Sequence, residues 1–382
     1  MTPRLSIIIP TRNRSQLCLA TARSVLAFDV DFEIVIYDSS TEDGLEAQLA
    51  GLNDARVRYI RACGQLNMTQ CFEFAVAEAR GEFVCMIGDD DGVTPALFAC
   101  VDLGVSENLD SVTTTASAFV LYNWPDIRSR YFGDEASGRL MLRVTGRAAD
   151  VRIVPATSLL AEFLKRAGQG CGDLPRVYHG LVRRALLGRM RSTFGRCFDG
   201  VSPDVSFSYL AARLSDRHAI VQTPLTISGT SASSNAGRSA MHQHKGDLWS
   251  DAHMKNYRDE VWPSTVPEFF SVETVWGQAT LAALLTAGED IGAFNLPHLY
   301  GLLLVRHYDR WRETLRVLAR QSMAIKWATC AATAMVALSE AASIFRKLAR
   351  RSVRDRRIET FRAASIVEAS ALVNVRMAEI LP

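Results

Sequence analysis

Three adjacent carboxylates, Asp89, Asp90 and Asp91, follow directly after the apolar run of residues 83–87. Such a run predicts a strand buried on both faces of a parallel sheet, and the glycine and proline that follow can end it and open a helix. Three neighbouring acids repel one another unless a cation or solvent compensates their charge. Carboxylate oxygens suit Mg²⁺ or Mn²⁺, which can in turn hold a phosphate. The stretch therefore indicates a metal and phosphate site, with a solvated acidic turn as the alternative.

Polar side chains also follow two other predicted strands, residues 5–9 and 33–37. They are Pro10, Thr11, Arg12 and Arg14 after the first strand, and Asp38 after the second. Ligands of open α/β sheets bind outside the carboxyl ends of the strands, so we expect these side chains and the acid triplet to share one edge. Acids beside arginines at such an edge suit a nucleotide whose diphosphate is held through a metal. A surface position for Arg12 and Arg14, and a helix-capping role for Asp38, are the alternatives.

The elements that must position these groups are strands alternating with helices. Four strand patterns, at residues 5–9, 33–37, 57–60 and 83–87, are separated by helical patterns. This alternation predicts an α/β fold with a doubly wound, Rossmann-like sheet. The first strand is not followed by G-x-G-x-x-G, and the chain has no G-x-x-x-x-G-K-[ST]. The pattern therefore argues against a dinucleotide fingerprint and against a P-loop.

The middle of the chain adds further candidate residues. Pro203 can begin a helix, which would place Asp204 in its first turn, where an acid also offsets the helix dipole. A last strand is expected over residues 219–227, followed by a loop of small polar residues. His242 and His244 lie beyond this loop. They could add a metal ligand or contact a diphosphate, and solvated loop histidines are the alternative.

The predicted secondary structure changes near residue 264. We expect residues 1–264 to form one domain, with a nucleotide-binding half at 1–100 and an acceptor half at 101–264. Residues 265–382 show only helical patterns, at 267–287, 296–320, 322–349 and 353–380, and predict an all-α appendage. Seven of the twelve residues from Arg346 to Arg357 are Arg or Lys. This basic run is either a solvated helix face or a peripheral membrane contact.

Composition narrows the class of protein. The 382 residues carry a formal net charge of +2, which argues against general nucleic-acid binding. None of the eight cysteines forms a C-x-x-C pair, and several lie in apolar runs, as expected of buried thiols in a reducing cytoplasm. The start of the chain does not read as a signal peptide, and the longest charge-free apolar stretch, 327–339, is too short to span a bilayer. We expect a cytoplasmic protein, with the basic run at the inner face of the cell membrane.

At its strand ends the chain resembles family 2 glycosyltransferases of the GT-A fold, an inverting class that uses nucleotide sugars. The matching segments are residues 5–14, 33–40, 79–83 and 88–91, and their order and spacing match the family over roughly residues 4–100. A looser resemblance to bacterial polysaccharide enzymes follows, resting on the acid after Ser202-Pro203 and on the Gly229-Thr230-Ser231 loop. The C-terminal helical patterns add nothing to it. The resemblance implies a GT-A type mixed sheet.

The resemblance also implies roles for individual residues. Those of the nucleotide site would be Pro10 and Thr11 at the nucleoside, Asp38 accepting the imide N–H of the base, and Asp89 at the ribose. Apart from the resemblance, we expect Arg12 and Arg14 to contact the phosphate or the base. Asp90 and Asp91 would hold Mn²⁺ or Mg²⁺, and Asp204 would be the general base that deprotonates the acceptor. Gly88 and Pro203 stand where family members often carry further acids, which leaves open which of the three acids binds the metal.

The function implied is transfer of a sugar from a nucleotide-diphosphate donor, UDP-linked by this reading, to an acceptor hydroxyl with inversion. The acceptor would be a glycan or a lipid-linked glycan of bacterial surface polysaccharide assembly. Two alternatives stay open. One is a nucleotidyltransferase that makes the activated sugar, although such enzymes normally carry a glycine-rich loop where this chain has Pro10 to Arg14. The other is an inactive scaffold that recruits partners through its helical end.

Overall fold

The computed structural model describes most of the chain. The described residues are 2–127, 134–145, 150–234, 237, 246–257, 260–350 and 358–380. His242 and His244 lie outside them, so a role for either stays a prediction. Of the basic run from Arg346 to Arg357, the described part is the helical backbone of residues 346–350, so its membrane contact also stays a prediction.

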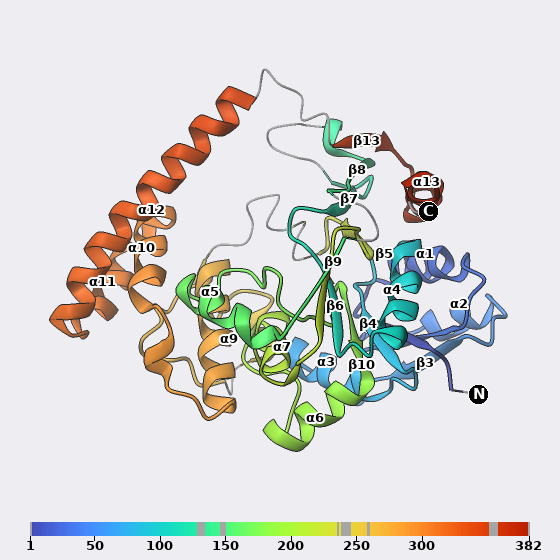
Figure 1. Ribbon diagram of the computed structural model, residues 1–382, viewed down its shortest axis with the longest axis horizontal. Coiled ribbons are helices and arrows are strands. Elements are labelled where there is room, and N and C mark those ends of the chain that lie inside the picture. The colour runs from blue at the N-terminus through green and yellow to red at the C-terminus, as the bar shows by residue number, and fades with distance from the viewer. Residues whose placement is uncertain are drawn as a thin grey trace.

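The larger sheet of the described chain has eight strands in the order β3-β2-β1-β4-β10-β6-β11-β9 (Figure 1). The neighbours β3, β2, β1 and β4 are parallel, whereas β10 runs antiparallel to β4 and β6. The bounds are β1 Leu5–Thr11, β2 Phe32–Asp38, β3 Val57–Arg61, β4 Phe83–Met86, β6 Ser111–Thr114, β9 Val151–Val154, β10 Gly180–Arg183 and β11 His218–Val221. The predicted doubly wound α/β unit and its mixed sheet are confirmed.

Helices cover both faces of the parallel strands. Consecutive side chains of a strand point to opposite faces of the sheet, so neighbouring residues pack against different helices. In β1, Ile7 and Ile9 are buried with side chains of α1, α2 and α4, while Ile8 is buried with α3, α6 and α7. The helix bounds are α1 Ser15–Leu26, α2 Leu45–Ala50, α3 Met68–Ala77, α4 Pro95–Ser106, α5 Leu160–Lys165, α6 Arg184–Phe194 and α7 Pro203–Leu214. Burial on both faces fixes β1, so Thr11 at its end is held at the sheet edge.

A smaller sheet in the described residues has the order β13-β8-β7-β12-β5. Its bounds are β5 Gly92–Val93, β7 Phe119–Asn123, β8 Arg139–Arg143, β12 Thr226–Thr230 and β13 Glu359–Arg362. Strand β12 pairs with β5, directly after the acid triplet. The single strand expected over 219–227 is wrong, because β11 belongs to the larger sheet and β12 to the smaller one, with Pro224 between them. This switch of sheet brings residues 229–231 to the triplet.

The helices expected over 267–287 and 322–349 are confirmed as α9 Val272–Thr286 and α12 Met323–Arg350, whereas the single helix expected over 296–320 is divided into α10 Leu296–Arg306 and α11 Trp311–Ala319. Short 3-10 helices occur at Asp134–Ala136, Ala156–Leu159, Met254–Asn256, Ile291–Ala293 and Tyr308–Arg310. The helix expected over 353–380 is wrong in its first part. Strand β13 pairs with β8, and α13 Ile366–Ile380 packs on α1 and α4 through side chains such as Ile366 and Val373. The last described residues thus join the smaller sheet and pack on helices that cover the larger one, and the domain boundary near 264 stays a prediction.

One helix in the described residues is long and apolar enough to cross a membrane by length and composition. It is the segment Met323–Phe345 of α12, of which most is exposed. The sequence expectation stopped at 327–339 because it admitted no charge, whereas this segment includes Lys326 and Glu340.

Candidate functional site

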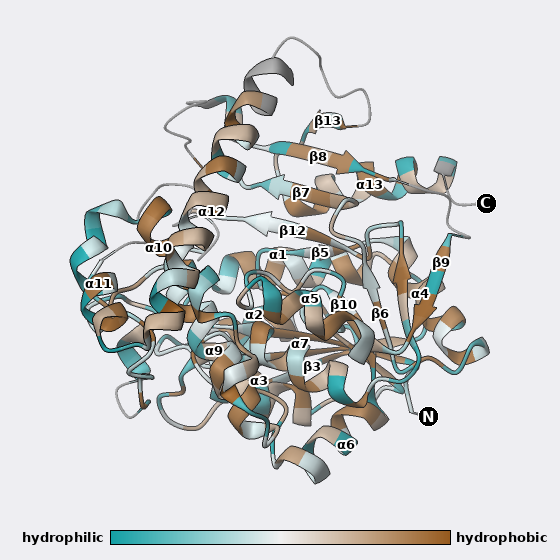
Figure 2. Cartoon of the chain, turned by 60° about the vertical axis from the view of Figure 1, so that its left-hand side comes forward, coloured by the Kyte–Doolittle hydropathy of each residue, from teal (hydrophilic) through white to brown (hydrophobic). Residues whose placement is uncertain are grey.

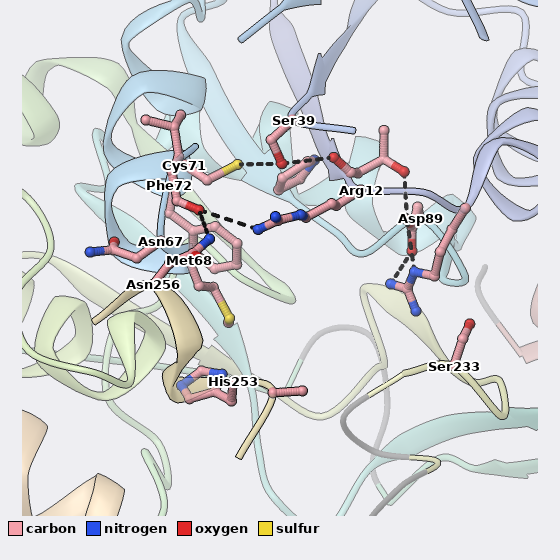
Figure 3. A pocket seen from close by; sticks show the side chains of 15 residues that line it. Arg12, Ser39, Asn67, Met68, Cys71, Phe72, Asp89, Ser233, His253 and Asn256 are labelled. Carbon is pink, nitrogen blue, oxygen red and sulfur yellow. Dashed lines mark hydrogen bonds and ion pairs between the residues drawn. The ribbon is translucent and has the colours of Figure 1, made fainter. Parts of the chain in front are cut away.

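A cavity of about 400 Å³ opens at the carboxyl ends of β1 and β2 (Figure 3). Its lining brings together five of the six predicted nucleotide-binding residues: Pro10, Thr11, Arg12, Arg14 and Asp89. The rest of the wall comes from Ser39, from Leu66, Asn67, Met68, Cys71 and Phe72 at the start of α3, and from Ser233, Ala252, His253 and Asn256. A concave site of this size with a few convergent polar groups is suited to a small ligand.

Asp89 is fully buried and is held by the last residue of β1 and by the residue before α1. Thr11 Oγ1 donates a hydrogen bond of 2.6 Å to Oδ2 of Asp89, and Nε of Arg14 donates one of 3.0 Å to the same oxygen. Arg14 Nη2 forms an ion pair with the other oxygen, Oδ1. Burial raises the pKa of Asp89 to about 7, against the lowering effect of the Arg14 charge. Arg14 therefore supplies the positive charge that the acid triplet lacks in its own sequence neighbourhood.

Asp90 faces the loop that follows β12. The backbone N–H and hydroxyl of Ser231 donate hydrogen bonds of 3.1 and 2.6 Å to its Oδ2. Arg14 Nη1 lies 3.8 Å from the same oxygen. The described residues donate no hydrogen bond to the second oxygen, Oδ1, of Asp90. One oxygen of this buried carboxylate is thus fixed in place, and the other is available to a ligand.

Asp91 is enclosed by donors on both oxygens. Gly229 N–H donates to Oδ1 at 2.7 Å, while Gly88 N–H and the Tyr178 hydroxyl donate to Oδ2 at 2.6 and 3.1 Å. His179 Nε2 lies 3.3 Å from Oδ2. Burial and the neighbouring charge of Asp90 raise the pKa of Asp91 to about 7. Its bonds tie β12 and the segment before β10 to the loop after β4.

Close packing makes glycine necessary on one side of this loop. A Cβ on Gly229 would lie 1.7 Å from the carbonyl oxygen of Asp90, so a larger residue would push β12 off the triplet. The same carbonyl accepts a 2.8 Å hydrogen bond from Nε1 of Trp124. Thr21 Oγ1 donates to the carbonyl oxygens of Asp89 and Asp91 from α1. The backbone of the triplet is therefore fixed as firmly as its side chains.

Asp38 lies at the end of β2 beside the cavity but not in its lining. Its Oδ2 accepts hydrogen bonds from the Tyr59 hydroxyl at 2.9 Å and from Arg61 Nη1 at 3.0 Å. Its Oδ1 accepts one from the Ser40 N–H at 2.8 Å. The neighbouring Ser39 does line the cavity. The structure thus shows Asp38 holding the turn after β2, and its expected contact with a base stays a prediction.

Asp204 occupies the first turn of α7, as expected, and is part-buried. The Ser202 hydroxyl donates a 2.8 Å hydrogen bond to its Oδ1. Burial and Arg176 lower the pKa of His179 to about 4, while the charges of Asp90 and Asp204 oppose that shift. Asp204 does not line the cavity, so its role as general base stays a prediction.

The start of α7 is tied to the cavity wall by two hydrogen bonds. Nε2 of His253 lies 2.6 Å from the carbonyl oxygen of Val201, and the Thr69 hydroxyl donates to that of Gly200 at 2.6 Å. His253 lines the cavity and Thr69 lies in the first turn of α3. The segment before the helix that carries Asp204 thus packs against the wall of the cavity lined by Arg14 and Asp89.

The side chains of this site fit a divalent metal that takes most of its ligands from outside the protein. No group of three or more His, Cys, Asp or Glu side chains within the described ranges could hold a metal ion. Mg²⁺ is usually bound through one or two carboxylates together with substrate phosphates and water, so an all-protein cage is not required. The unbonded Oδ1 of Asp90 meets that need. Both oxygens of Asp91 already accept hydrogen bonds, and metal binding by Asp91 stays a prediction.

Sequence reasoning missed several supporting residues. Tyr178 and His179 reach Asp91 from the segment before β10, and His253 and Asn256 form the far wall of the cavity. None of them lies in a motif, and their approach depends on long-range packing. The Gly229-Thr230-Ser231 loop did carry a signal, and Gly229 and Ser231 are the two residues through which it contacts the triplet.

Comparisons with known proteins find similar sequences for the first part of the chain. Residues 6–119 match the family model described as Glycosyl transferase family 2. The putative colanic acid biosynthesis glycosyl transferase WcaA of Escherichia coli is 37% identical over 98 residues, which cover 24% of this chain and 34% of WcaA. The uncharacterized protein y4gI of Sinorhizobium fredii is 38% identical over 95 residues, 23% of this chain and 10% of that protein. The chain thus spans about a third or less of these relatives.

Solved structures also align over most of the chain at low identity. S. aureus TarS 1-349 in complex with UDP-GlcNAc covers 86% of this chain and 79% of its own, with 14% identity and a TM-score of 0.46. The mannosyltransferase PcManGT from Pyrobaculum calidifontis, in complex with GDP-Man and Mn²⁺, covers 98% and 88%, with 13% identity and a TM-score of 0.43. The family match, which includes most of β1, Asp38 and the acid triplet, confirms over residues 6–119 the resemblance to glycosyl transferase family 2 seen in the sequence.

Proposed function

We propose that the chain transfers a glycosyl group from a nucleoside-diphosphate sugar to an acceptor hydroxyl, with inversion at the anomeric carbon. The observation that carries the proposal is the position of Arg14 in the cavity wall. Its Nη1 is buried and has no hydrogen-bond acceptor among the described residues, and it lies 3.8 Å from Asp90. A cation in need of an acceptor beside a carboxylate with an unused oxygen suits a diphosphate that carries a divalent metal.

The donor would occupy the cavity, with its nucleoside against Pro10, Thr11 and Ser39. Asp89, bonded to Thr11 and Arg14, would present a carboxylate edge to the ribose. We assign UDP as the nucleotide, because a carboxylate such as Asp38 can accept the imide N–H of uracil, whereas the matching ring nitrogen of cytosine carries no proton, and because the resemblance favours UDP among the bases that have such an N–H. The Arg12 guanidinium, in the same wall, adds positive charge for the phosphates.

The chemistry would be divided between two ends of the site. Asp90 would hold Mn²⁺ or Mg²⁺, and the metal, when bound, neutralises charge on the departing diphosphate. Asp204 would accept the proton of the acceptor hydroxyl as that oxygen attacks the anomeric carbon from the face opposite the leaving group. Ser202, which donates to one oxygen of Asp204, keeps the carboxylate oriented and leaves the other oxygen for the acceptor. The acceptor would be a glycan or a lipid-linked glycan in bacterial surface polysaccharide assembly, inside the cell.

Release of nucleoside diphosphate from donor sugars tests this proposal. UDP-linked hexoses are incubated with the full chain in Mn²⁺ and in EDTA, with the Asp90→Ala variant as the matched control. The proposal expects slow metal-dependent release of UDP by the wild type, and none by the variant. Binding of UDP without release under any condition would favour the inactive scaffold. Equal release of UDP by the wild type and by Asp90→Ala would show that Asp90 has no part in the reaction.

A further inference from the structure

The long helix α12 presents an apolar face that no described part of the chain covers. Three of its large side chains are among the most exposed in the structure: Trp327 at 71%, Leu338 at 72% and Phe345 at 77%. Met323 and Met335 are also exposed. Figure 2 shows hydrophobic residues along α12 where the helix stands away from the sheets. Contiguous exposed apolar surface of this kind marks a binding surface rather than a scatter of single residues.

The spacing of these residues places them on one side of the helix. Leu338 and Phe345 follow Trp327 by eleven and eighteen positions, which are close to three and five full turns. Ala332 and Val336, on the opposite side, are buried against α10. A Cβ on Gly301 of α10 would meet the backbone at Ala332 at 3.0 Å, so the two helices are in close contact. The apolar stripe faces away from the protein, and we call residues Met323, Trp327, Met335, Leu338 and Phe345 the outer face of α12.

An ionic network fixes α12 to the body of the protein. Arg306 on α10 bonds Glu340 of α12 through Nε at 2.8 Å, and its Nη1 bonds Glu273 of α9 at 3.1 Å. His307 Nε2 lies 2.7 Å from the second oxygen of Glu273. Crossing a bilayer would therefore require α12 to leave α10 or to take the buried α10 with it. Lying along a surface requires neither change.

The charge around the outer face is strongly positive. Residues 310–357 contain twelve Arg or Lys and three Asp or Glu, whereas the whole chain contains 43 and 41. Arg312 and Arg316 on α11 and Arg320 at its C-cap are exposed, and α11 adjoins the start of α12 (Figure 1). Glu313 and Glu340 are both paired with arginines. An uncharged apolar face bordered by the exposed arginines of the adjoining segment complements an anionic lipid surface. Two copies of this segment would instead repel each other.

From this arrangement we infer that the outer face of α12 lies in the headgroup region of an anionic membrane, with the α11 arginines at the lipid phosphates. Trp327 and Phe345 would enter the boundary between headgroups and acyl chains, which Trp favours. The surface is separate from the nucleotide cavity, so the inference holds or fails independently of the proposed transfer reaction.

Co-sedimentation with vesicles provides the first test. The full chain is mixed with vesicles of phosphatidylcholine alone or with about one third phosphatidylglycerol, at low and high salt. We expect binding to the anionic vesicles that weakens with salt, and a partition coefficient at least about tenfold lower for Trp327→Glu combined with Leu338→Glu. Val375→Glu on α13 is the matched control, since Val375 is 67% exposed on a helix at the other side of the molecule and should bind as the wild type does (Figure 1).

Two exposed cysteines allow the contact to be located. Cys330 lies on α12 and Cys63 lies just beyond β3. An environment-sensitive fluorophore on Cys330, in a Cys63→Ser background, should shift to the blue on anionic vesicles. The same label on Cys63, in a Cys330→Ser background, should not. An unchanged Cys330 signal on bound vesicles, or no binding at low salt, would overturn the inference. Light scattering checks for a dimer. If the wild type is a dimer that does not bind vesicles, and the Trp327→Glu and Leu338→Glu variant is a monomer, the face binds a second copy of the chain instead.

Discussion

Nε of Arg14 donates a hydrogen bond of 3.0 Å to Oδ2 of Asp89, joining the residue before α1 to the loop after β4. The same guanidinium also reaches Asp90. Three adjacent acids at a strand end are tolerated because this one cation, with the hydroxyls of Thr11 and Ser231, compensates two of them. The remaining acid, Asp91, is held by backbone N–H groups and by Tyr178.

Replacing Arg14 by alanine should therefore lower both stability and nucleotide affinity. It leaves buried carboxylates without their counterion, and breaking a buried pair costs about 3 kcal/mol or more when the remaining charge stays buried. Thermal denaturation of Arg14→Ala, Asp89→Asn and the double variant measures the coupling. We expect Asp89→Asn to restore part of the stability that Arg14→Ala loses. Additive losses would show that the two side chains do not interact.

The variants Asp90→Ala and Asp91→Ala should differ in whether they mainly lose nucleotide binding or stability. Asp91→Ala removes the acceptor for the buried N–H groups of Gly88 and Gly229, and each unsatisfied group costs about 1–3 kcal/mol. Its melting temperature should fall clearly. Asp90→Ala leaves a single buried N–H, that of Ser231, without its acceptor, so it should lose less stability than Asp91→Ala while losing Mn²⁺-dependent nucleotide binding. Calorimetric titration with nucleotide, beside thermal denaturation, separates the two effects. Full metal-dependent binding by Asp90→Ala would contradict the assignment.

Asp204→Asn preserves size but cannot take a proton at neutral pH. If Asp204 is the general base, kcat should fall by roughly 10²–10⁴-fold while donor affinity hardly changes. Asp199 is the internal control, because it accepts hydrogen bonds from Gly200 N–H and Thr286 and thereby holds the turn before α7. Asp199→Asn should be mild in kcat. The reverse outcome, an inactive Asp199→Asn beside an active Asp204→Asn, would move the base to the 199 turn.

The Glu273 carboxylate predicts a pH dependence of stability. Burial opposes its ionisation, but the hydrogen bond with His307 and the Arg306 contact outweigh burial and lower the pKa of Glu273 to about 2. A pKa below the unfolded value of about 4.3 means that the charge stabilises the fold at neutral pH, and that this contribution is lost as pH falls from about 4 to about 2.

The melting temperatures of wild type and Glu273→Gln should accordingly differ most near neutral pH, and the difference should close in the acid range. Glu46→Gln, an exposed change on α2, serves as the control and should show little difference at any pH. If the difference in melting temperature between wild type and Glu273→Gln stays constant from pH 7 to pH 2, hydrogen bonding and not ionisation accounts for the effect.

The strands and much of the site could be predicted because their signals are local. The apolar runs that become β1, β2 and β4 are buried on both faces, so composition alone identifies them, and the polar residues after them meet at one edge. The pairing of Arg14 with Asp89 spans 75 positions and depends on packing, which no local pattern records. For Asp38 the sequence showed an acid at a strand end but not Tyr59 and Arg61, which occupy one of its oxygens.

Short strands at the edge of a sheet were the other feature that the sequence did not predict. Residues 359–362 read Glu-Thr-Phe-Arg and become β13 only because β8 offers an unpaired edge beside them. Pro224, in contrast, was a visible signal that the strand over 219–227 must break, since proline cannot donate to a sheet. The exposure of α12 could not be seen in advance, because a helix rich in Ala, Leu and Met has the same composition whether it is buried or uncovered.

Nucleotide titration calorimetry in Mn²⁺ tests the central claim most directly. If the cavity beside Arg14 and Asp89 is a nucleoside-diphosphate site with Asp38 at the base, the wild type should bind UDP, and CDP clearly more weakly. Replacing Arg14 by alanine should weaken UDP binding about tenfold or more, the scale of one lost charge-assisted contact. Absence of binding for UDP, GDP and dTDP alike, or equal UDP affinity in the wild type and the Arg14→Ala variant, would contradict the account.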